Sequence, residues 1–147
     1  MDPIVEKIAQ NIEAAINLVT VANGFNQILT AVRSRRVDFS DVTPSDGIVL
    51  LVMGGEEQPE GVIGCQEWIQ GFELVCFVLD SDRSTDAIDI RKNKVRADLQ
   101  KKLKADPSRG GLAIDTELAP SSQFEDGIAV GIKVYYRVDM YDPYELA

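Results

Sequence analysis

The 147-residue sequence contains no histidine, only two cysteines and a single tryptophan. Without histidine the chain lacks the usual general base near neutral pH and the usual activator of a serine or cysteine nucleophile. A hydrolase of the common kind is therefore disfavoured. The two cysteines, Cys65 and Cys76, do not form a close-spaced metal motif. We expect both to be reduced thiols, with Cys76 in the core.

Long apolar runs are also absent, and basic residues are outnumbered by acidic ones. No run approaches the roughly 18 apolar residues of a membrane-spanning helix, and the first residues do not resemble a signal peptide, so we expect a cytoplasmic protein. The net charge of −9 disfavours general binding to nucleic acid or to an anionic membrane. At this length we expect one domain, residues 1–147, with a core that needs no disulfide or metal.

The most informative stretch of the sequence runs from Leu79 to Leu118. It predicts a helix that begins near Ser84 or Thr85, ends at Asp106 and Pro107, and is followed by a Gly110–Gly111 turn with positive φ angles and then a strand. Apolar residues recur at helical spacing and predict the buried stripe: Ile88, Val95, Leu99 and Leu103, with the stem of Lys92 between them. Between residues 89 and 104, seven basic residues stand against two acidic ones, so this helix is basic on an acidic protein.

The rest of the chain predicts one more helix and four more strands. The helix covers residues 2–22, and the strands cover residues 27–37, 48–53, 67–79 and 128–140, with loops at 54–64 and 119–126. The polar strand 27–37 is expected at a sheet edge. The predicted class is α+β, with a mainly antiparallel sheet of about five strands and two main helices, in the order α-β-β-β-α-β-β.

Asp80, Asp82 and Asp86 come closest to a chemical motif, because their spacing begins like a calcium loop. However, Thr85 stands where that loop needs glycine, and Arg91 stands where it needs a bidentate glutamate. Acidic helix-capping residues are the simpler interpretation. A small acidic metal-binding protein or carboxylate enzyme that uses these residues is the alternative from another functional class.

Three further charged groups have both a functional and a structural interpretation. Arg33, Arg35 and Arg36 have the composition of a phosphate clamp, but they also suit a sheet edge that is blunted by charge. The glutamates of the 54–64 loop suit a cation or acid and base chemistry, but a solvated loop explains them as well: Glu56, Glu57 and Glu60. Arg109 with its two glycines is neither a phosphate loop nor, as a single triplet, good evidence of RNA binding.

Two motifs suggest a family. The segment A-D-P-S-R-G-G-L-A at residues 105–113 follows the charged helix, and V-Y-Y-R-V-D at residues 134–139 precedes Pro143 and Tyr144. Together they resemble the tail terminator proteins, also called minor tail or tail completion proteins, of long-tailed bacteriophages, the family that includes the terminator of phage lambda. The first strand with its arginines and the element order are similar too. The resemblance therefore covers nearly the whole chain.

The resemblance implies a structural subunit without enzymatic activity or cofactor. Such subunits form a ring, typically a hexamer, on the last ring of the tail tube, where they stop tube polymerisation and offer a surface to the head-tail connector. The expected partners are the chain itself, the tail tube protein and the connector protein, with no sequence-specific nucleic acid and no membrane. The expected location is the head-proximal end of the virion tail, after assembly in the bacterial cytoplasm. Another neck completion protein of the same particle is the nearest alternative.

A ring needs two different, complementary patches on each subunit, and a basic helix on an acidic body is one way to supply them. We expect Arg91, Lys94 and Lys101 to face acidic residues of a neighbour, and the 54–64 loop to order only on assembly. The candidate interface residues for the ring and the tube are Arg33, Arg35, Arg36, Glu56, Glu57, Glu60, Arg91, Lys94, Lys101 and Arg109.

Overall fold

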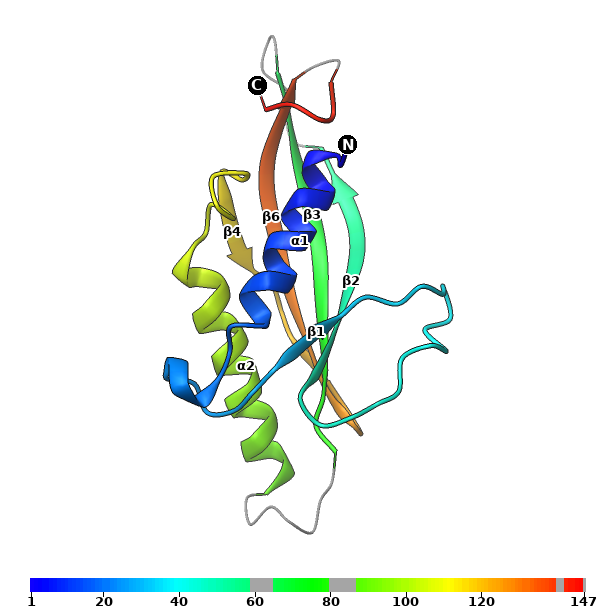
Figure 1. The fold of residues 1–147 in the computed structure, drawn as a ribbon, viewed down its shortest axis with the longest axis vertical. Coiled ribbons are helices and arrows are strands. Elements are labelled where there is room, and N and C mark those ends of the chain that lie inside the picture. Colours follow the sequence, from blue (N-terminus) through cyan, green and yellow to red (C-terminus); the bar gives the residue numbers. More distant parts are fainter. Residues whose placement is uncertain (59–64, 80–86, 140–141, 147) are drawn as a thin grey trace.

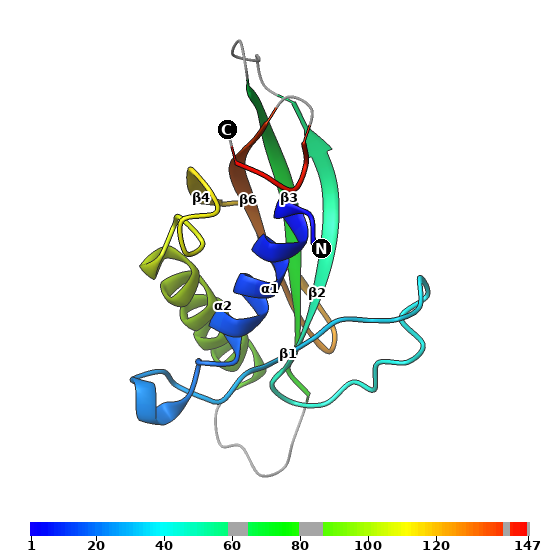
Figure 2. The ribbon, with the colours of Figure 1, turned by 45° about the horizontal axis from the view of Figure 1, so that its top comes forward.

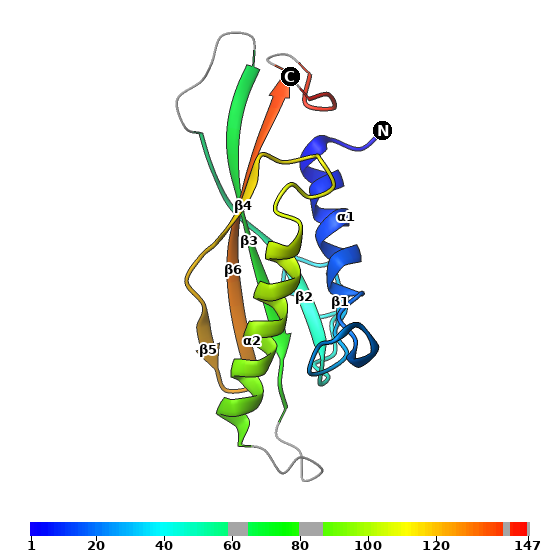
Figure 3. The ribbon, with the colours of Figure 1, turned by 90° about the vertical axis from the view of Figure 1, so that its left-hand side faces the viewer.

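The computed structural model describes residues 1–58, 65–79, 87–139 and 142–146. The described residues form two helices on one face of a single sheet, and the other face of the sheet is not covered by a helix (Figures 1 and 3). The helices are α1 (Ile4–Ile16) and α2 (Ile88–Ala105), with a short 3-10 helix η1 (Val21–Asn23) after α1. The strands are β1 (Thr30–Val32), β2 (Ile48–Glu57), β3 (Cys65–Phe77), β4 (Asp115–Leu118), β5 (Ser122–Phe124) and β6 (Gly127–Asp139).

The sheet is mixed, with the strand order β1-β2-β3-β6-β4, and β5 also pairs with β6. Only β1 and β2 run parallel; the other pairings are antiparallel. The longest ladder joins β3 to β6 from Cys65 opposite Asp139 to Phe77 opposite Gly127. The predicted α+β class is confirmed, with β1 at the sheet edge where the polar strand was expected.

The core lies between the helices and the inner face of the sheet. The period of two predicted for the last strand is confirmed, because alternate residues of β6 are buried: Ile128, Val130, Ile132, Val134 and Tyr136. From α1 the core receives Ile4, Ile8, Ile12 and Ile16, and from α2 it receives Val95, Leu99 and Leu103. Lys92 is buried beside them as predicted, and its Nζ donates to the carbonyl oxygens of Phe124, at 2.6 Å, and Glu125, at 3.3 Å.

The end of α2 and the glycine turn after it were predicted from the sequence. The helix ends at Ala105 with Asp106 as its C-cap, and Gly110 and Gly111 have φ angles of 70° and 87°. Arg109 also has a positive φ, of 50°, which the sequence did not indicate. At the other end, α2 begins after Ala87, while the predicted cap residues Ser84 and Thr85 lie outside the described residues.

Four sequence predictions of element length or type were wrong. The first helix ends at Ile16, because the chain turns there. Val19 then packs in the core, and its carbonyl accepts a backbone hydrogen bond from the N–H of Leu29. The first strand has only the residues Thr30–Val32. β2 continues through a bulge into Gly54–Glu57, which were expected in a loop. β5, also expected in a loop, is too short and polar to show a strand period.

One glycine explains how β6 begins so close to its neighbour. A Cβ on Gly127 would lie 2.1 Å from the carbonyl oxygen of Cys76 on β3, so no side chain fits there. The sequence placed this glycine only at the end of a loop. Close approach of the two backbones lets the β3–β6 ladder continue to its last pair, Phe77 opposite Gly127.

The chain leaves the body between β1 and β2. In Figures 1 and 2 the segment after β1 runs out to the side of the sheet and returns to the start of β2. We call residues 34–46 of this segment the arm. Among the described residues, no helix has the length and apolar character needed to cross a membrane.

Candidate interaction surfaces

The structure describes little that resembles a chemical site. Asp80, Asp82, Asp86 and Glu60 lie outside the described residues, and the described residues contain no cluster of histidine, cysteine, aspartate or glutamate suited to a metal ion. Burial raises the pKa of the Cys76 thiol to about 12, so this cysteine is an inert core residue. The core position of Cys76 is the one predicted from the sequence.

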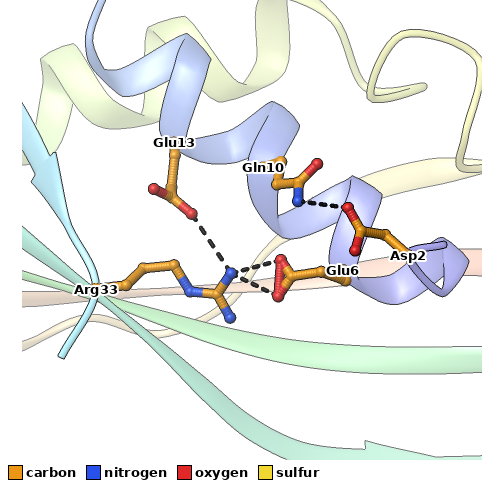
Figure 4. A network of polar contacts seen from close by, with 5 residues as sticks. All are labelled: Asp2, Glu6, Gln10, Glu13 and Arg33. Atoms are coloured by element: carbon orange, nitrogen blue, oxygen red, sulfur yellow. Dashed lines mark hydrogen bonds and ion pairs between the residues drawn. The ribbon is translucent and has the colours of Figure 1, made fainter. Parts of the chain in front are cut away.

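Arg33 joins the end of β1 to α1. Its Nη1 lies 2.6 Å from the carboxylate of Glu6 and 3.5 Å from that of Glu13, and the hydrogen bond to Glu6 raises the pKa of Arg33 (Figure 4). On the same helix, Gln10 donates to Asp2. Arg33 thus contacts two carboxylates of its own subunit, whereas Arg35 and Arg36 are exposed. The three arginines do not act as one clamp.

Several hydrogen bonds shape the arm, and Asp41 accepts two of them. Asp41 accepts hydrogen bonds from the Ser34 hydroxyl and, at 2.7 Å, from the backbone N–H of Arg35, and these bonds lower the pKa of Asp41. Arg35 and Arg36 are exposed, Val37 is 97% exposed, and Phe39 is 42% exposed. The arm therefore has a fixed shape but presents two cations and two apolar side chains to solvent.

A cavity of about 350 Å³ opens at the end of the sheet where α1 begins (Figure 1 shows these elements converging). We call it the cup. Its walls come from Pro3, Val5, Gln66, Trp68, Tyr136, Val138 and Pro143, and its acidic residues are Glu56, Asp139 and Asp142. The chain end closes one wall, because the N–H of Ile4 donates to the carbonyl of Pro143 at 3.0 Å.

Inside the cup, aromatic and acidic groups lie together. The Tyr136 hydroxyl donates to Glu56 at 3.1 Å, and burial, with the charge of Glu56, raises the pKa of Tyr136. Trp68, the single tryptophan of the chain, is half-buried beside them. An apolar aromatic wall next to carboxylates suits a basic side chain better than an anion or a purely apolar group.

The basic surface of α2 is less available than the sequence indicated. Arg91 forms an ion pair with Asp46 at 2.7 Å and donates to the carbonyl of Leu79, so it ties α2 to the end of the arm. Lys101 lies 4.9 Å above the Phe25 ring and 3.5 Å from the carbonyl of Gly24. Lys94 is on the exposed side of the helix. Two of the three predicted interface cations thus support contacts within the subunit.

Arg109 requires a correction, because it is not on the surface. Its side chain is 1% exposed, and its Nη2 donates to the carbonyl oxygens of Leu103 and Asp106 at the end of α2. These carbonyl groups have no partner within the helix and carry the negative end of its dipole. Burial lowers the pKa of Arg109, while nearby Asp106 opposes this effect. Arg109 therefore completes the helix end rather than an interface.

Sequence reasoning missed most of the two surfaces that the structure brings out. Trp68 and Tyr136 were read only as strand residues, and Val37 and Phe39 were not singled out. Val37 is one of several exposed apolar residues of the chain, and only its place directly after two exposed arginines distinguishes it. Glu56 was a candidate, but as part of a loop rather than of the cup.

Comparison of the chain with protein-family models finds no match, and comparison with curated proteins finds none either. Two kinds of observation therefore bear on the function of the chain. One is the resemblance of residues 105–113 and 134–139 to tail terminators. The other is the geometry of the arm, the cup and α2.

Proposed function

We propose that the chain is a structural subunit that assembles with copies of itself into a ring. The observation that carries the proposal is the arm, a segment of fixed shape that stands off the body with Arg35, Arg36 and Val37 exposed. A monomer gains nothing from an apolar side chain held 97% in solvent. A subunit that places it against a neighbour buries that surface.

The resemblance extends the proposal to a tail terminator of a long-tailed phage. The ring, a hexamer by analogy, binds the last ring of tube protein, ends tube polymerisation and offers its other side to the head-tail connector. Each subunit carries unlike patches in different places, an arm beside β2 and a cup at the far end of the sheet, and unlike patches are what a closed ring needs. The net charge of −9 suits a channel through which DNA passes without binding.

The test adds the purified protein to polymerising tail tube protein and measures tube length and end structure by negative-stain microscopy. We expect tubes that stop growing and carry a ring with rotational symmetry at one end. A protein that leaves tube length unchanged and binds purified connector rings instead is a neck completion protein of another kind. A protein that binds neither tubes nor connectors, and forms no ring, contradicts the proposal.

A further inference from the structure

The arm and the cup are complementary in charge and in apolar character. The arm presents two cations followed by an aliphatic side chain, Arg35, Arg36 and Val37. The cup presents carboxylates beside an aromatic wall, with Glu56 and Asp142 next to Trp68. Its volume of about 350 Å³ has room for side chains rather than for a helix or strand.

The arm of a subunit does not fill the cup of the same subunit. No arm residue lines the cup, whose walls come from α1, β2, β3, β6 and the chain end among the described residues. The arm instead leaves the body beside the first half of β2 and runs out to the side of the sheet (Figures 1 and 2), where residues 34–37 and Phe39 line a separate open hollow with residues 51–53 of β2. An arm that fills a cup must come from another molecule.

We propose that the arm of one copy inserts into the cup of a second copy. Arg35 and Arg36 meet the carboxylates at the mouth of the cup, and Val37 packs on Trp68. This contact rests on the proposed ring function and names the surface that joins its neighbours. It is heterologous, with a different patch on each partner, so repetition of the contact leads to a ring when the rotation closes.

The energetics favour this occupant over a purely apolar one. A guanidinium that enters the cup gains carboxylate partners beside the aromatic side chain of Trp68, and Val37 loses exposed apolar area. Because part of the attraction acts between charges at the mouth of the cup, association should weaken as salt increases. The internal hydrogen bonds of Asp41 hold the arm in one shape before it binds, which lowers the entropy cost of docking.

The experiment uses two full-length variants with opposite defects. The arm variant, Arg35→Glu/Arg36→Glu, keeps an intact cup, and the cup variant, Glu56→Lys, keeps an intact arm. Self-association is measured by sedimentation and native mass spectrometry. Circular dichroism and urea unfolding check that each variant is folded. Glu56→Gln, which keeps an acceptor for Tyr136 and removes the charge, serves if Glu56→Lys does not fold.

We expect the wild-type chain to self-associate and each variant alone to associate roughly 100-fold more weakly. A mixture of the arm variant with Glu56→Gln, which adds no cation to attract the reversed arm, should form a one-to-one dimer and nothing larger, because only one intact arm and one intact cup are present in each pair. The fluorescence of Trp68, the single tryptophan, should shift on mixing, because the arm of the cup variant then fills the cup of the arm variant. This dimer is the specific sign of an arm in a cup.

A control of equal charge separates this contact from a general effect of charge. Arg96→Glu/Lys102→Glu on α2 makes the same charge change as the arm variant and should assemble like the wild type. If this control abolishes assembly and the arm variant does not, α2 is the interface and the inference is wrong. A mixture that stays monomeric while the wild type assembles also overturns it.

The two proposals fail separately. A wild-type chain that is monomeric at every concentration, with unchanged Trp68 emission, contradicts the contact between arm and cup. The ring function is decided by tube length in the terminator assay. If the arm variant still caps tubes while the variants do not pair, the ring is real and uses another surface. If a basic segment of the tube protein, rather than a second copy, shifts Trp68 emission, the cup belongs to the tube interface and the inference is overturned.

Discussion

The face of α2 that packs on the sheet and the arm are held in place by different forces. Val95, Leu99 and Leu103 are buried completely or nearly so, and apolar burial fixes the helix on β6. In the arm, the shape depends on hydrogen bonds to Asp41, and Val37 contributes no burial. The buried face of α2 stabilises the folded subunit, whereas the ordered arm adds little to the stability of the subunit. The proposed contact with a second copy would explain this difference.

The largest expected effect on stability comes from a substitution in the buried face of α2. Leu99→Ala removes a completely buried side chain and should lower the free energy of unfolding by about 2–5 kcal/mol, through lost burial and the cavity that remains. Val37→Ala, at a 97% exposed position, should change it by no more than about 0.5 kcal/mol. Urea unfolding of both variants measures the difference. Equal effects would show that the arm packs on the body in solution.

A smaller effect is expected at the end of α2. Arg109→Met removes the side-chain donor to the carbonyl groups of Leu103 and Asp106 and should cost about 1–3 kcal/mol, because the buried Leu103 carbonyl is left without a partner, whereas the Asp106 carbonyl keeps the backbone N–H of residue 109. Lys102→Met, on the same last turn but half-exposed, is the matched control and should stay within about 0.5 kcal/mol. A stable Arg109→Met variant that cannot assemble would instead restore Arg109 to the interface.

The base of the arm should show an effect of about 1 kcal/mol. Arg33→Ala removes the ion pair with Glu6 and leaves Glu6 and Glu13 facing each other without a cation. A double-mutant cycle with Glu6→Ala isolates the pair, and Arg36→Ala, at an exposed position in the arm, is the control with no expected loss. A coupling energy of zero between Arg33 and Glu6 would mean that the contact does not form in solution.

The parts of the fold that sequence could predict are those with a period. The stripe of α2, the alternation of β6 and the stop at Asp106 follow from side-chain spacing and from backbone chemistry, and the structure confirms all three. The continuation of β2 through Gly54–Glu57 depends on pairing with β3 across a bulge, and no local period revealed it. β5 pairs with the start of β6 in a tight hairpin around Glu125 and Asp126, and it is too short to show a strand period. The glycine-rich and polar residues of these segments favour a loop, but pairing with a neighbouring strand makes each of them a strand.

The interaction surfaces were predictable only in part, for a related reason. Arg35, Arg36 and Glu56 were found because charge is visible in a sequence. The cup is not visible, since it forms where Trp68, Tyr136, Pro3 and Pro143 meet from separate segments of the chain. Arg109 was assigned to the surface because an arginine is usually exposed, and its role at the helix end depends on a backbone turn with positive φ.

The smallest effect concerns the shape of the arm and its dependence on pH. The pKa of Asp41 is lowered in the folded chain by the bond from Ser34 and the bond from the Arg35 N–H. The contribution of Asp41 to arm order is therefore complete above its pKa in the unfolded chain, and it is lost as pH falls through the lowered folded pKa. We expect the protection factor of the Arg35 amide, its exchange with solvent deuterium relative to the intrinsic rate at the same pH, to be high near neutral pH and to fall in acid.

Asp41→Ala should give the low protection factor at every pH and leave the urea midpoint unchanged, because the core does not depend on the arm. Asp38→Ala is the matched control. The Asp38 carboxylate accepts from the Ser40 N–H, and its pKa is lowered mainly by that bond, so this variant should loosen Ser40 and not Arg35. If Asp41→Ala leaves Arg35 protected, the arm takes its shape from other contacts. If it also moves the urea midpoint, the arm and the body form one unit rather than two regions with different roles.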